Sequence, residues 1–263
     1  MIHRQPALFI PHGGGPSFFM TGERKAIFES NEFFLRDLHT QLPQMPTAIL
    51  LVTAHWETDV PSFTGAPRPE LIYDYYGFPE HTYSLTYPAP GQPELAERAR
   101  QCLSEAGWPA RVDPQHGWDH GVFIPLKVMF PEAQIPVVAM SLHHSLDPAL
   151  HLQLGQALAP LRDEGVLIVG SGMSYHNLRQ FFEATPASHQ FHDWLTKSMN
   201  QGWQDRYEAL VNWSEAPGGR MSHPREEHLL PLMVVSGAGS DARGRCIWQG
   251  DVAGTALGAW AFD

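Results

Sequence analysis

The sequence has little cysteine, little charge and no long hydrophobic run. Its 263 residues include two cysteines, Cys102 and Cys246, which lie too far apart to form a zinc-binding or redox motif. This cysteine usage favours a reducing compartment. The longest apolar stretches, such as residues 48–54 and 229–238, are much shorter than the ~20 residues that a membrane helix needs. The apolar run at residues 7–11 is too short for a signal peptide. We therefore expect a soluble, cytoplasmic protein that has no membrane partner.

Basic residues are also scarce. Lys and Arg number 17 against 28 Asp and Glu, which gives a net charge of −11 with neutral histidines. The sequence contains no run rich in Lys and Arg, and a chain of this charge repels a phosphate backbone. Hydrophobic residues make up 43% of the chain, a composition typical of a globular protein and not of a disordered one. The sequence therefore predicts a globular chain that does not bind nucleic acid.

Apolar runs alternate with amphipathic segments, and no repeat or long linker divides the chain. Strands are predicted by short apolar runs at residues 6–11, 47–54, 136–142, 166–170 and 255–262. Helices are predicted by helical spacing of apolar residues at 27–42, 93–106, 148–162, 188–204 and 226–236. The last of these would begin with Pro224 and two acidic residues in its first turn. This order predicts one α/β domain over residues 1–263, in which a mostly parallel or mixed sheet carries helices on both faces.

The residue that the sequence does contain in quantity is histidine, with 15 copies. Imidazole is the commonest metal ligand in proteins and titrates near neutral pH. Three histidines follow predicted strands closely: His12, His55 and His176. Sites in α/β folds form at the edge where the carboxyl ends of parallel strands meet. If these strands are neighbours, the three histidines lie in one crevice; otherwise each of them caps only its own loop.

Two further segments contain candidate histidines. His228 would lie in the first turns of the helix predicted at residues 226–236, where an ordinary exposed position is the alternative. His116 and His120 lie on either side of an acid, and two glycines in that segment favour a turn over a helix. A turn held by its own polar side chains is the alternative there. The role of these residues therefore depends on whether they join the other three.

Motifs of the commoner enzyme classes are incomplete. Residues 12–15 (His-Gly-Gly-Gly) are similar to the oxyanion loop of lipases, but no serine has the flanking glycines of a nucleophile elbow. Residues 55–57 (His-Trp-Glu) lack the paired cysteines that accompany this pattern in zinc deaminases. Nitrogen ligands without a thiolate suit Fe, Zn, Cu or Ni. The residues alone therefore leave a zinc hydrolase, a non-haem Fe(II) enzyme and a non-catalytic metal-binding protein open.

Six short motifs occur in a fixed order from about residue 6 to residue 262. They are Pro-His-Gly-Gly-Gly-Pro at 11–16, Thr-Ala-His-Trp-Glu at 53–57, Tyr-Gly-Phe-Pro at 76–79, His-Gly-Trp-Asp-His-Gly at 116–121, Pro-Leu at 125–126 and Arg-Glu-Glu-His at 225–228. Each motif is weak alone, but the ordered set is specific. Together they resemble the class III extradiol ring-cleavage dioxygenases, in the branch of the DOPA 4,5-dioxygenase-like proteins.

This resemblance implies a single-domain α/β fold that holds one metal ion. By position, His12, His55 and His228 correspond to the metal ligands. His176 corresponds to the active-site histidine that acts as acid and base, and in this branch it is sometimes counted as a fourth ligand. His120 corresponds to a second active-site histidine, which would contact the substrate.

One departure concerns the third ligand, because the protocatechuate-cleaving branch uses two histidines and a glutamate. Glu227 is adjacent to His228 and would complete such a triad, although the order of the motifs favours His228. The implied metal is Fe(II), and Zn(II) could occupy the same ligands. The implied reaction opens a DOPA-like or related catechol with O₂ beside its two hydroxyls and gives a muconic semialdehyde. The implied partners are a small catechol and O₂, and the chain would be a monomer or small homo-oligomer; a zinc-dependent hydrolase on the same fold is the alternative function.

The aromatic segment at residues 73–79 suggests a further role. Tyr75, Tyr76 and Phe78 belong to a stretch, residues 71–91, that is rich in Tyr, Pro and Gly and predicts an ordered loop. These rings could form a wall or lid that stacks on a catechol, or they could pack as an ordinary loop.

Overall fold

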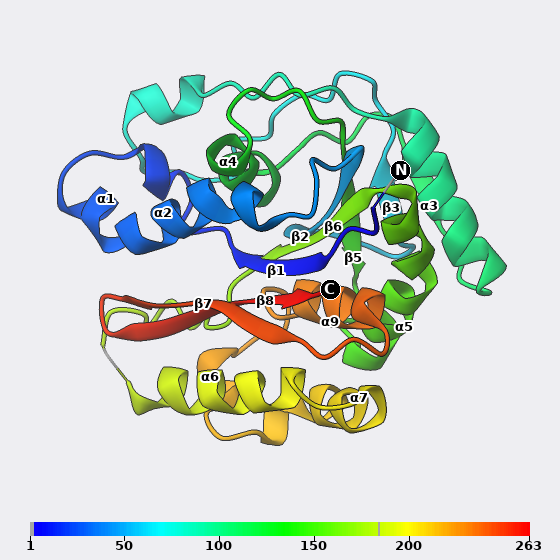
Figure 1. Ribbon diagram of the computed structural model, residues 1–263. Helices are drawn as coiled ribbons and strands as arrows, with labels where there is room; N and C mark the ends of the chain where they lie inside the picture. Colours follow the sequence, from blue (N-terminus) through cyan, green and yellow to red (C-terminus); the bar gives the residue numbers. More distant parts are fainter. Residues whose placement is uncertain (1–2, 184) are drawn as a thin grey trace.

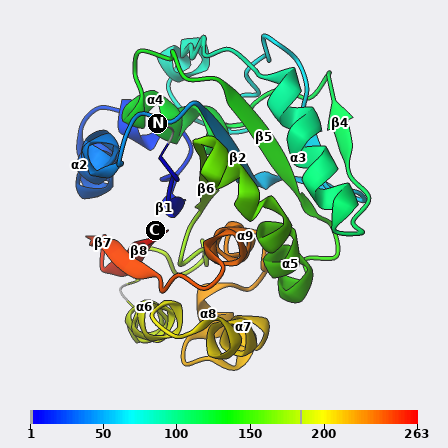
Figure 2. The ribbon, with the colours of Figure 1, turned by 45° about the vertical axis from the view of Figure 1, so that its right-hand side comes forward.

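The computed structural model describes residues 3–183 and 185–263, and Figure 1 shows its arrangement. Within these residues, a mixed sheet of eight strands has the order β4-β3-β5-β2-β6-β1-β8-β7. Helices cover both faces of the sheet (Figures 1 and 2). The predicted α/β fold is therefore confirmed.

The centre of the sheet consists of parallel strands. The neighbours, in order across the sheet, are β5 (Val137–His143), β2 (Ala48–Thr58), β6 (Val166–Gly172) and β1 (Ala7–Pro11). Their residues are almost all buried, because helices lie on both sides of the sheet. A strand that is buried on both faces has a continuous apolar sequence, which is why these strands could be predicted. The strands that precede His12 and His176 and the strand that contains His55 are thus adjacent and parallel.

The two edges of the sheet are less regular. On one side, β3 (Ser62–Thr64) pairs antiparallel with β5, and β4 (Arg111–Asp113) pairs with β3. On the other side, β8 (Thr255–Phe262) pairs antiparallel with β1, and β7 (Arg245–Val252) pairs with β8. The last strand, β8, has its predicted bounds, whereas the sequence pattern did not predict β3, β4 and β7. The first two are too short for a periodic pattern, and β7 is an edge strand whose residues are mostly half-buried or exposed.

Two hydrophobic cores fill the spaces between the helices and the sheet. One face carries α1 (Glu23–Ile27), α2 (Glu29–Leu38) and α4 (His120–Met129). The other face carries α3 (Pro93–Glu105), α5 (Pro148–Leu158) and α9 (Leu230–Gly239). Further along this face, α6 (Pro186–Met199) packs against β8, and α7 (Trp203–Val211) and α8 (Gly219–Ser222) lie next to α6 (Figure 2). None of the helices described in residues 3–183 and 185–263 has the length and apolar character needed to cross a membrane.

Several predicted helices are shorter than expected. The one at 27–42 is divided between α1, α2 and a 3₁₀ turn, and the one at 188–204 ends at Met199 before α7 begins. The helix at 148–162 becomes 3₁₀ after Leu158, where a proline occupies the first turn. The prediction that a helix begins near Pro224 was wrong. Residues 224–229 form turns and α9 begins at Leu230, with a proline in its first turn.

Candidate metal centre

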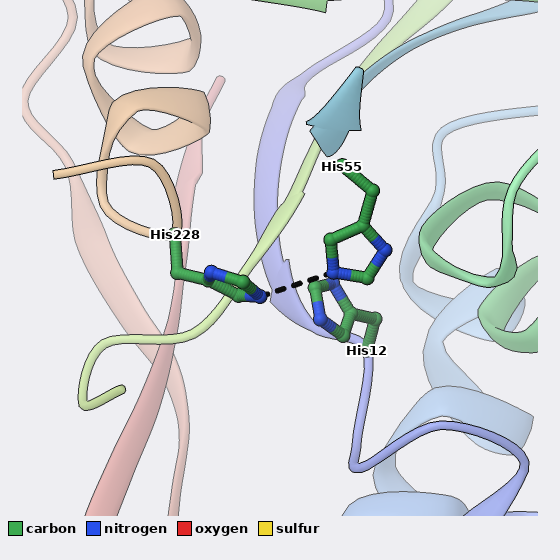
Figure 3. Close-up of side chains that lie close together, drawn as sticks. All are labelled: His12, His55 and His228. Atoms are coloured by element: carbon green, nitrogen blue, oxygen red, sulfur yellow. Dashed lines mark hydrogen bonds between the residues drawn. The ribbon is translucent and has the colours of Figure 1, made fainter. Parts of the chain in front are cut away.

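Three histidines from distant parts of the chain meet at the carboxyl edge of the sheet. His12 follows the last residue of β1, and His55 lies within β2, which continues to Thr58 and is longer than predicted. His228 lies in the turn before α9, and its carbonyl accepts a hydrogen bond from the Met173 backbone N–H just after β6. Figure 3 shows that the three rings point toward one another. One nitrogen from each ring lies within 4.8 Å of the others, and the Nε2 atoms of His55 and His228 are 3.1 Å apart.

The other ring nitrogen of each histidine faces an acceptor. Nδ1 of His12 lies 3.1 Å from Oγ of Ser171, and this hydroxyl donates its own proton to the Gly121 carbonyl, so that it accepts from His12. Nδ1 of His228 donates to Oε1 of Glu227 at 3.0 Å. A ring that donates from Nδ1 has its lone pair on Nε2. This orientation by a partner behind the ring is typical of histidines that bind metals.

His55 is oriented by two carboxylates. Its Nδ1 lies 3.1 Å from Asp74 Oδ2 and 3.5 Å from Asp119 Oδ1, and Thr53 Oγ1 donates to the same Asp119 oxygen at 2.8 Å. Burial by itself would lower the pKa of His55, but Asp119 and Asp74 outweigh it and raise that pKa to about 9. The two carboxylates therefore favour a positive charge at this position, which a proton or a metal ion can supply.

His12 and His228 have the opposite electrostatic character. Both side chains are buried, and this burial together with the neighbouring histidines lowers their pKa values well below the usual 6.5. They are therefore neutral at neutral pH, the form in which imidazole binds metals. Three imidazole donors suit a divalent transition metal such as iron or zinc. The residues present therefore fit one such ion.

His176 lies beside this group and shares a carboxylate with it. Its ring stacks on that of His228, with 3.3 Å between the ring centroids. Its Nδ1 lies 3.3 Å from Oε1 of Glu227, the oxygen that also accepts from His228. Glu227 is thus placed behind the two rings. Although burial opposes it, the two histidines hold the pKa of Glu227 below its usual range, so that it is an ionised acceptor.

His120 is the first residue of α4 and faces the same cluster. Its Nδ1 lies 2.8 Å from Asp74 Oδ1, and its backbone N–H donates to that oxygen at 2.9 Å. Its ring centroid is 4.0 Å from that of His55. The turn that was predicted around His116 and His120 thus extends only as far as Asp119. His116 stays outside the cluster and stacks on Trp56, with 3.9 Å between centroids.

The sequence pattern did not predict a functional role for the acceptors Ser171, Asp74 and Asp119. Ser171 follows a buried strand between two glycines, and Asp119 lies inside a motif between two histidines. These positions are weak signals that the residues belong to a site. Asp74 lies in a loop rich in tyrosine and has no comparable signal, because its partner His120 lies 46 residues further along the chain.

One cavity of about 770 Å³ joins these groups. Five histidines line it: His12, His55, His120, His176 and His228. The hypothesis that strand-end histidines converge on one crevice is therefore confirmed. The loop at residues 71–91 contributes Asp74 and Phe78 to the lining. Tyr75 and Tyr76 do not belong to it, since Tyr75 is buried with its hydroxyl donating to Thr82 and Tyr76 is 91% exposed.

These features define a class of protein. Three imidazoles can hold one metal ion and leave coordination positions free, and the cavity beside them has room for a small organic substrate. Further imidazoles line the cavity, where they can move protons. The fold and the site thus describe an α/β enzyme built around a candidate mononuclear metal centre.

Comparison with known proteins gives the family. The family described as the catalytic LigB subunit of aromatic ring-opening dioxygenase matches residues 6–255. The chain therefore belongs to the LigB family of class III extradiol dioxygenases, and the resemblance found in its motifs is confirmed. Its function is that of an extradiol ring-cleaving dioxygenase. The family therefore favours a dioxygenase over a zinc-dependent hydrolase, the alternative function considered from the sequence.

Several relatives match most of the chain. "Dioxygenase tasH" of Hapsidospora irregularis is 39% identical over 251 residues, which cover 89% of this chain and 78% of that protein. "4,5-DOPA dioxygenase extradiol" of Portulaca grandiflora is 38% identical and covers 86% of each chain. The protein of the same description from Escherichia coli K12 is 37% identical and covers 89% of this chain and 85% of its own. A solved structure, "uncharacterized protein JW3007 from Escherichia coli K12", aligns with a TM-score of 0.80 at 31% identity, covering 99% of this chain and 100% of the other.

Proposed function

We propose that this chain is a non-haem Fe(II)-dependent dioxygenase that opens the ring of a catechol with O₂ and gives a muconic semialdehyde. The observation that carries the proposal is the convergence of the imidazoles of His12, His55 and His228, each with Nδ1 turned toward an oxygen. This set leaves three Nε2 lone pairs for one metal ion in the cavity of a ring-opening dioxygenase.

His12, His55 and His228 would hold the metal. When bound, Fe(II) supplies open coordination positions and the redox chemistry that lets a catechol react with O₂. Glu227 is less suited than His228 to be the third ligand, because its Oε1 lies against the Nδ1 atoms of His176 and His228. Zn(II) also binds imidazole well, so the metal found in a purified sample does not by itself identify the metal that supports activity.

His176 is the proposed acid and base. Glu227 fixes its Nδ1 side, which leaves Nε2 as the nitrogen that can accept a proton from a catechol hydroxyl and later return it. The ring lines the cavity and lies against His228, next to the proposed metal position. A histidine in this role contributes roughly 10²- to 10⁴-fold to turnover. The resemblance also allows His176 to be a fourth metal ligand. The metal content of a variant that lacks His176 distinguishes this role from that of acid and base.

His120 is the proposed substrate contact. Asp74 Oδ1 lies against its Nδ1, so that Nε2 is left for a substrate oxygen. Burial and the neighbouring His55 lower the pKa of His120, although Asp74 acts in the opposite direction. The lowered pKa favours the neutral ring. A neutral ring fixed in this way can accept a hydrogen bond from a catechol hydroxyl without a competing charge.

The test is O₂ uptake after anaerobic reconstitution with Fe(II). The panel consists of catechol, DOPA and resorcinol. DOPA is included because several relatives are named for it, and resorcinol is included because its two hydroxyls are not adjacent. We expect one O₂ consumed per yellow ring-opened product with catechols, no reaction with resorcinol, and no uptake with Zn(II) alone. Absence of uptake with every catechol, despite one bound Fe(II) per chain, would contradict the proposal.

A further inference from the structure

We infer that the cavity is built for a catechol that carries an extended, uncharged apolar substituent, and not for one whose side chain is a charged amino acid. The inference rests on the proposed function, because it specifies the substrate class of the same site. It comes from the size of the cavity, from the side chains that line it beyond the histidines, and from the pairing of its charged groups.

The cavity is larger than a catechol ring requires. Its volume of about 770 Å³ lies within the range, roughly 300–1,000 Å³, of sites that enclose drug-sized ligands. A bare catechol is a single ring with two hydroxyl groups, and it would occupy only the part of the cavity next to the histidines. The remaining space can therefore accommodate a substituent on the ring.

Apolar side chains form much of the cavity lining besides the histidines, and we call them the apolar wall: Met20, Ile27, Phe28, Phe78, Met173, Leu178, Phe181 and Phe182. Three of its phenylalanines are neighbours. The ring centroids of Phe28 and Phe181 are 6.4 Å apart, and those of Phe181 and Phe182 are 5.2 Å apart. Leu178 is 70% exposed and Phe182 is 63% exposed, so that a large apolar surface at the cavity faces water. An apolar substituent would bury this surface.

The apolar wall reaches the histidine cluster through the glycine loop after β1. A Cβ on Gly14 would lie 3.2 Å from Cζ of Phe28, and one on Gly15 would lie 3.0 Å from Cζ of Phe78. Gly15 also has a positive φ of 55°, which side-chain-bearing residues rarely adopt. The glycines therefore allow the two phenyl rings to lie directly against the loop that follows His12. A bound ring and its substituent can thus contact apolar surface without interruption.

The charged groups of the cavity are already paired. Among the described residues that line it, Arg225 is the single Lys or Arg, and its two Nη atoms lie 2.6 and 2.7 Å from the carboxylate oxygens of Glu57. Asp74 is engaged by His55 and His120, and Glu227 by His176 and His228. A substrate carboxylate would find no free cation here, and a substrate ammonium would have to displace an existing partner. Burying either charge without a partner is costly.

The experiment measures kcat/KM by O₂ uptake for catechol, 4-methylcatechol, 4-propylcatechol, 4-hexylcatechol and DOPA, using the Fe(II)-reconstituted enzyme. We expect kcat/KM to rise about two- to fourfold per added CH₂ until the apolar wall is covered, because each buried CH₂ contributes transfer free energy of this size. We expect 4-propylcatechol to exceed DOPA by tenfold or more. A flat series, or DOPA faster than 4-propylcatechol, would overturn the inference.

A variant pair tests the wall itself. In the double variant Leu178→Ser, Phe182→Ser, both changes are at exposed side chains that line the cavity, so that folding is little affected. We expect the ratio of kcat/KM for 4-hexylcatechol to that for catechol to fall about tenfold. Tyr76→Ser is the matched control, since Tyr76 is 91% exposed and lies outside the cavity. Equal ratios in the double variant and the control would contradict the inference.

Failure of the proposed function can be told apart from failure of this inference. If no catechol consumes O₂, the proposed function fails, and anaerobic calorimetry with 4-hexylcatechol and catechol then tests the apolar wall without turnover. Tighter binding of 4-hexylcatechol, weakened in the double variant, would support the inference. Equal affinity for both compounds would overturn it.

Discussion

The Nε2 atoms of His55 and His228 lie 3.1 Å apart, although 173 residues separate them in the sequence. One belongs to β2, and the other precedes α9, which packs against β6, β1 and β2. Two nitrogen lone pairs at this distance repel unless a positive charge lies between them. The carboxylates of Asp74 and Asp119 behind His55 favour such a charge. The packing of α9 on the sheet therefore places His228 next to His55, at a distance suited to a shared metal ion.

The substitution His176→Ala separates the two roles of that residue. We expect the metal to stay bound at one ion per chain, because the group formed by His12, His55 and His228 does not include His176. Turnover should fall by roughly 10²- to 10⁴-fold, since the base would be lost. Metal analysis and O₂ uptake on the same sample provide the measurement. Loss of stoichiometric metal would make His176 a ligand.

Glu227→Ala tests the carboxylate behind His176 and His228. Without Glu227 Oε1, the Nδ1 atom of His228 loses its acceptor and the ring is no longer held in one orientation. We expect metal affinity to fall about 10- to 100-fold, as measured by competition with a chromophoric chelator. Glu226→Ala is the neighbouring control, because Glu226 pairs with Arg220 and does not line the cavity. Equal affinities in the two variants would show that Glu227 does not orient the ring.

Arg162 is a fully buried cation that stabilises the fold. It donates to the carbonyls of Gln5, Ala238 and Phe262 at 2.7 to 2.9 Å and so joins the region before β1, the end of α9 and the end of β8. Arg162→Met leaves three buried carbonyls without this partner, and we expect the free energy of unfolding to fall by about 3 kcal/mol or more.

Arg4→Met is the control for this stability prediction. Arg4 pairs with Asp163 at the surface, where the two side chains are 44% and 59% exposed. An exposed ion pair contributes less than about 1 kcal/mol. Urea unfolding of the two variants provides the comparison, and a similar loss of stability in both would contradict the prediction.

His151 should make the protein sensitive to acid. It is fully buried, its Nε2 accepts from the His143 backbone N–H at 3.1 Å, and burial lowers its pKa to about 4. Between pH 6.5 and 4 the unfolded chain binds a proton here and the folded chain does not. The contribution of His151 is therefore fully present above pH 6.5 and is lost as the pH falls toward 4, by up to about 3 kcal/mol.

Comparison of unfolding free energies at pH 7 and pH 4.5 tests this prediction. The loss between the two pH values should be smaller in His151→Gln than in the wild type, because the substituted side chain does not titrate. His39→Gln, a change at an exposed histidine, should keep the wild-type loss. An unchanged loss in His151→Gln would show that His151 does not carry the pH dependence.

Much of the fold could be predicted because the central strands are buried on both faces. Such strands have continuous apolar sequences, and these were recognised with bounds within a few residues for β1, β5, β6 and β8. The start of α9 was missed because two signals compete there. Pro224 with its acidic neighbours and the later Pro231 both suit a first helical turn, and only the later one occupies it.

The sequence by itself determined the fold class, the histidines near the carboxyl ends of the central strands, and the family that the ordered motifs resemble. These properties depend on local pattern and on the order of residues along the chain. Only the tertiary structure decided which strands are neighbours, which oxygen faces each Nδ1, and that Phe28 and Phe181 form one wall. These contacts join residues that lie far apart in sequence, such as His12 and Ser171 at a separation of 159 residues, and sheet packing brings them together where no local pattern can specify the pairing.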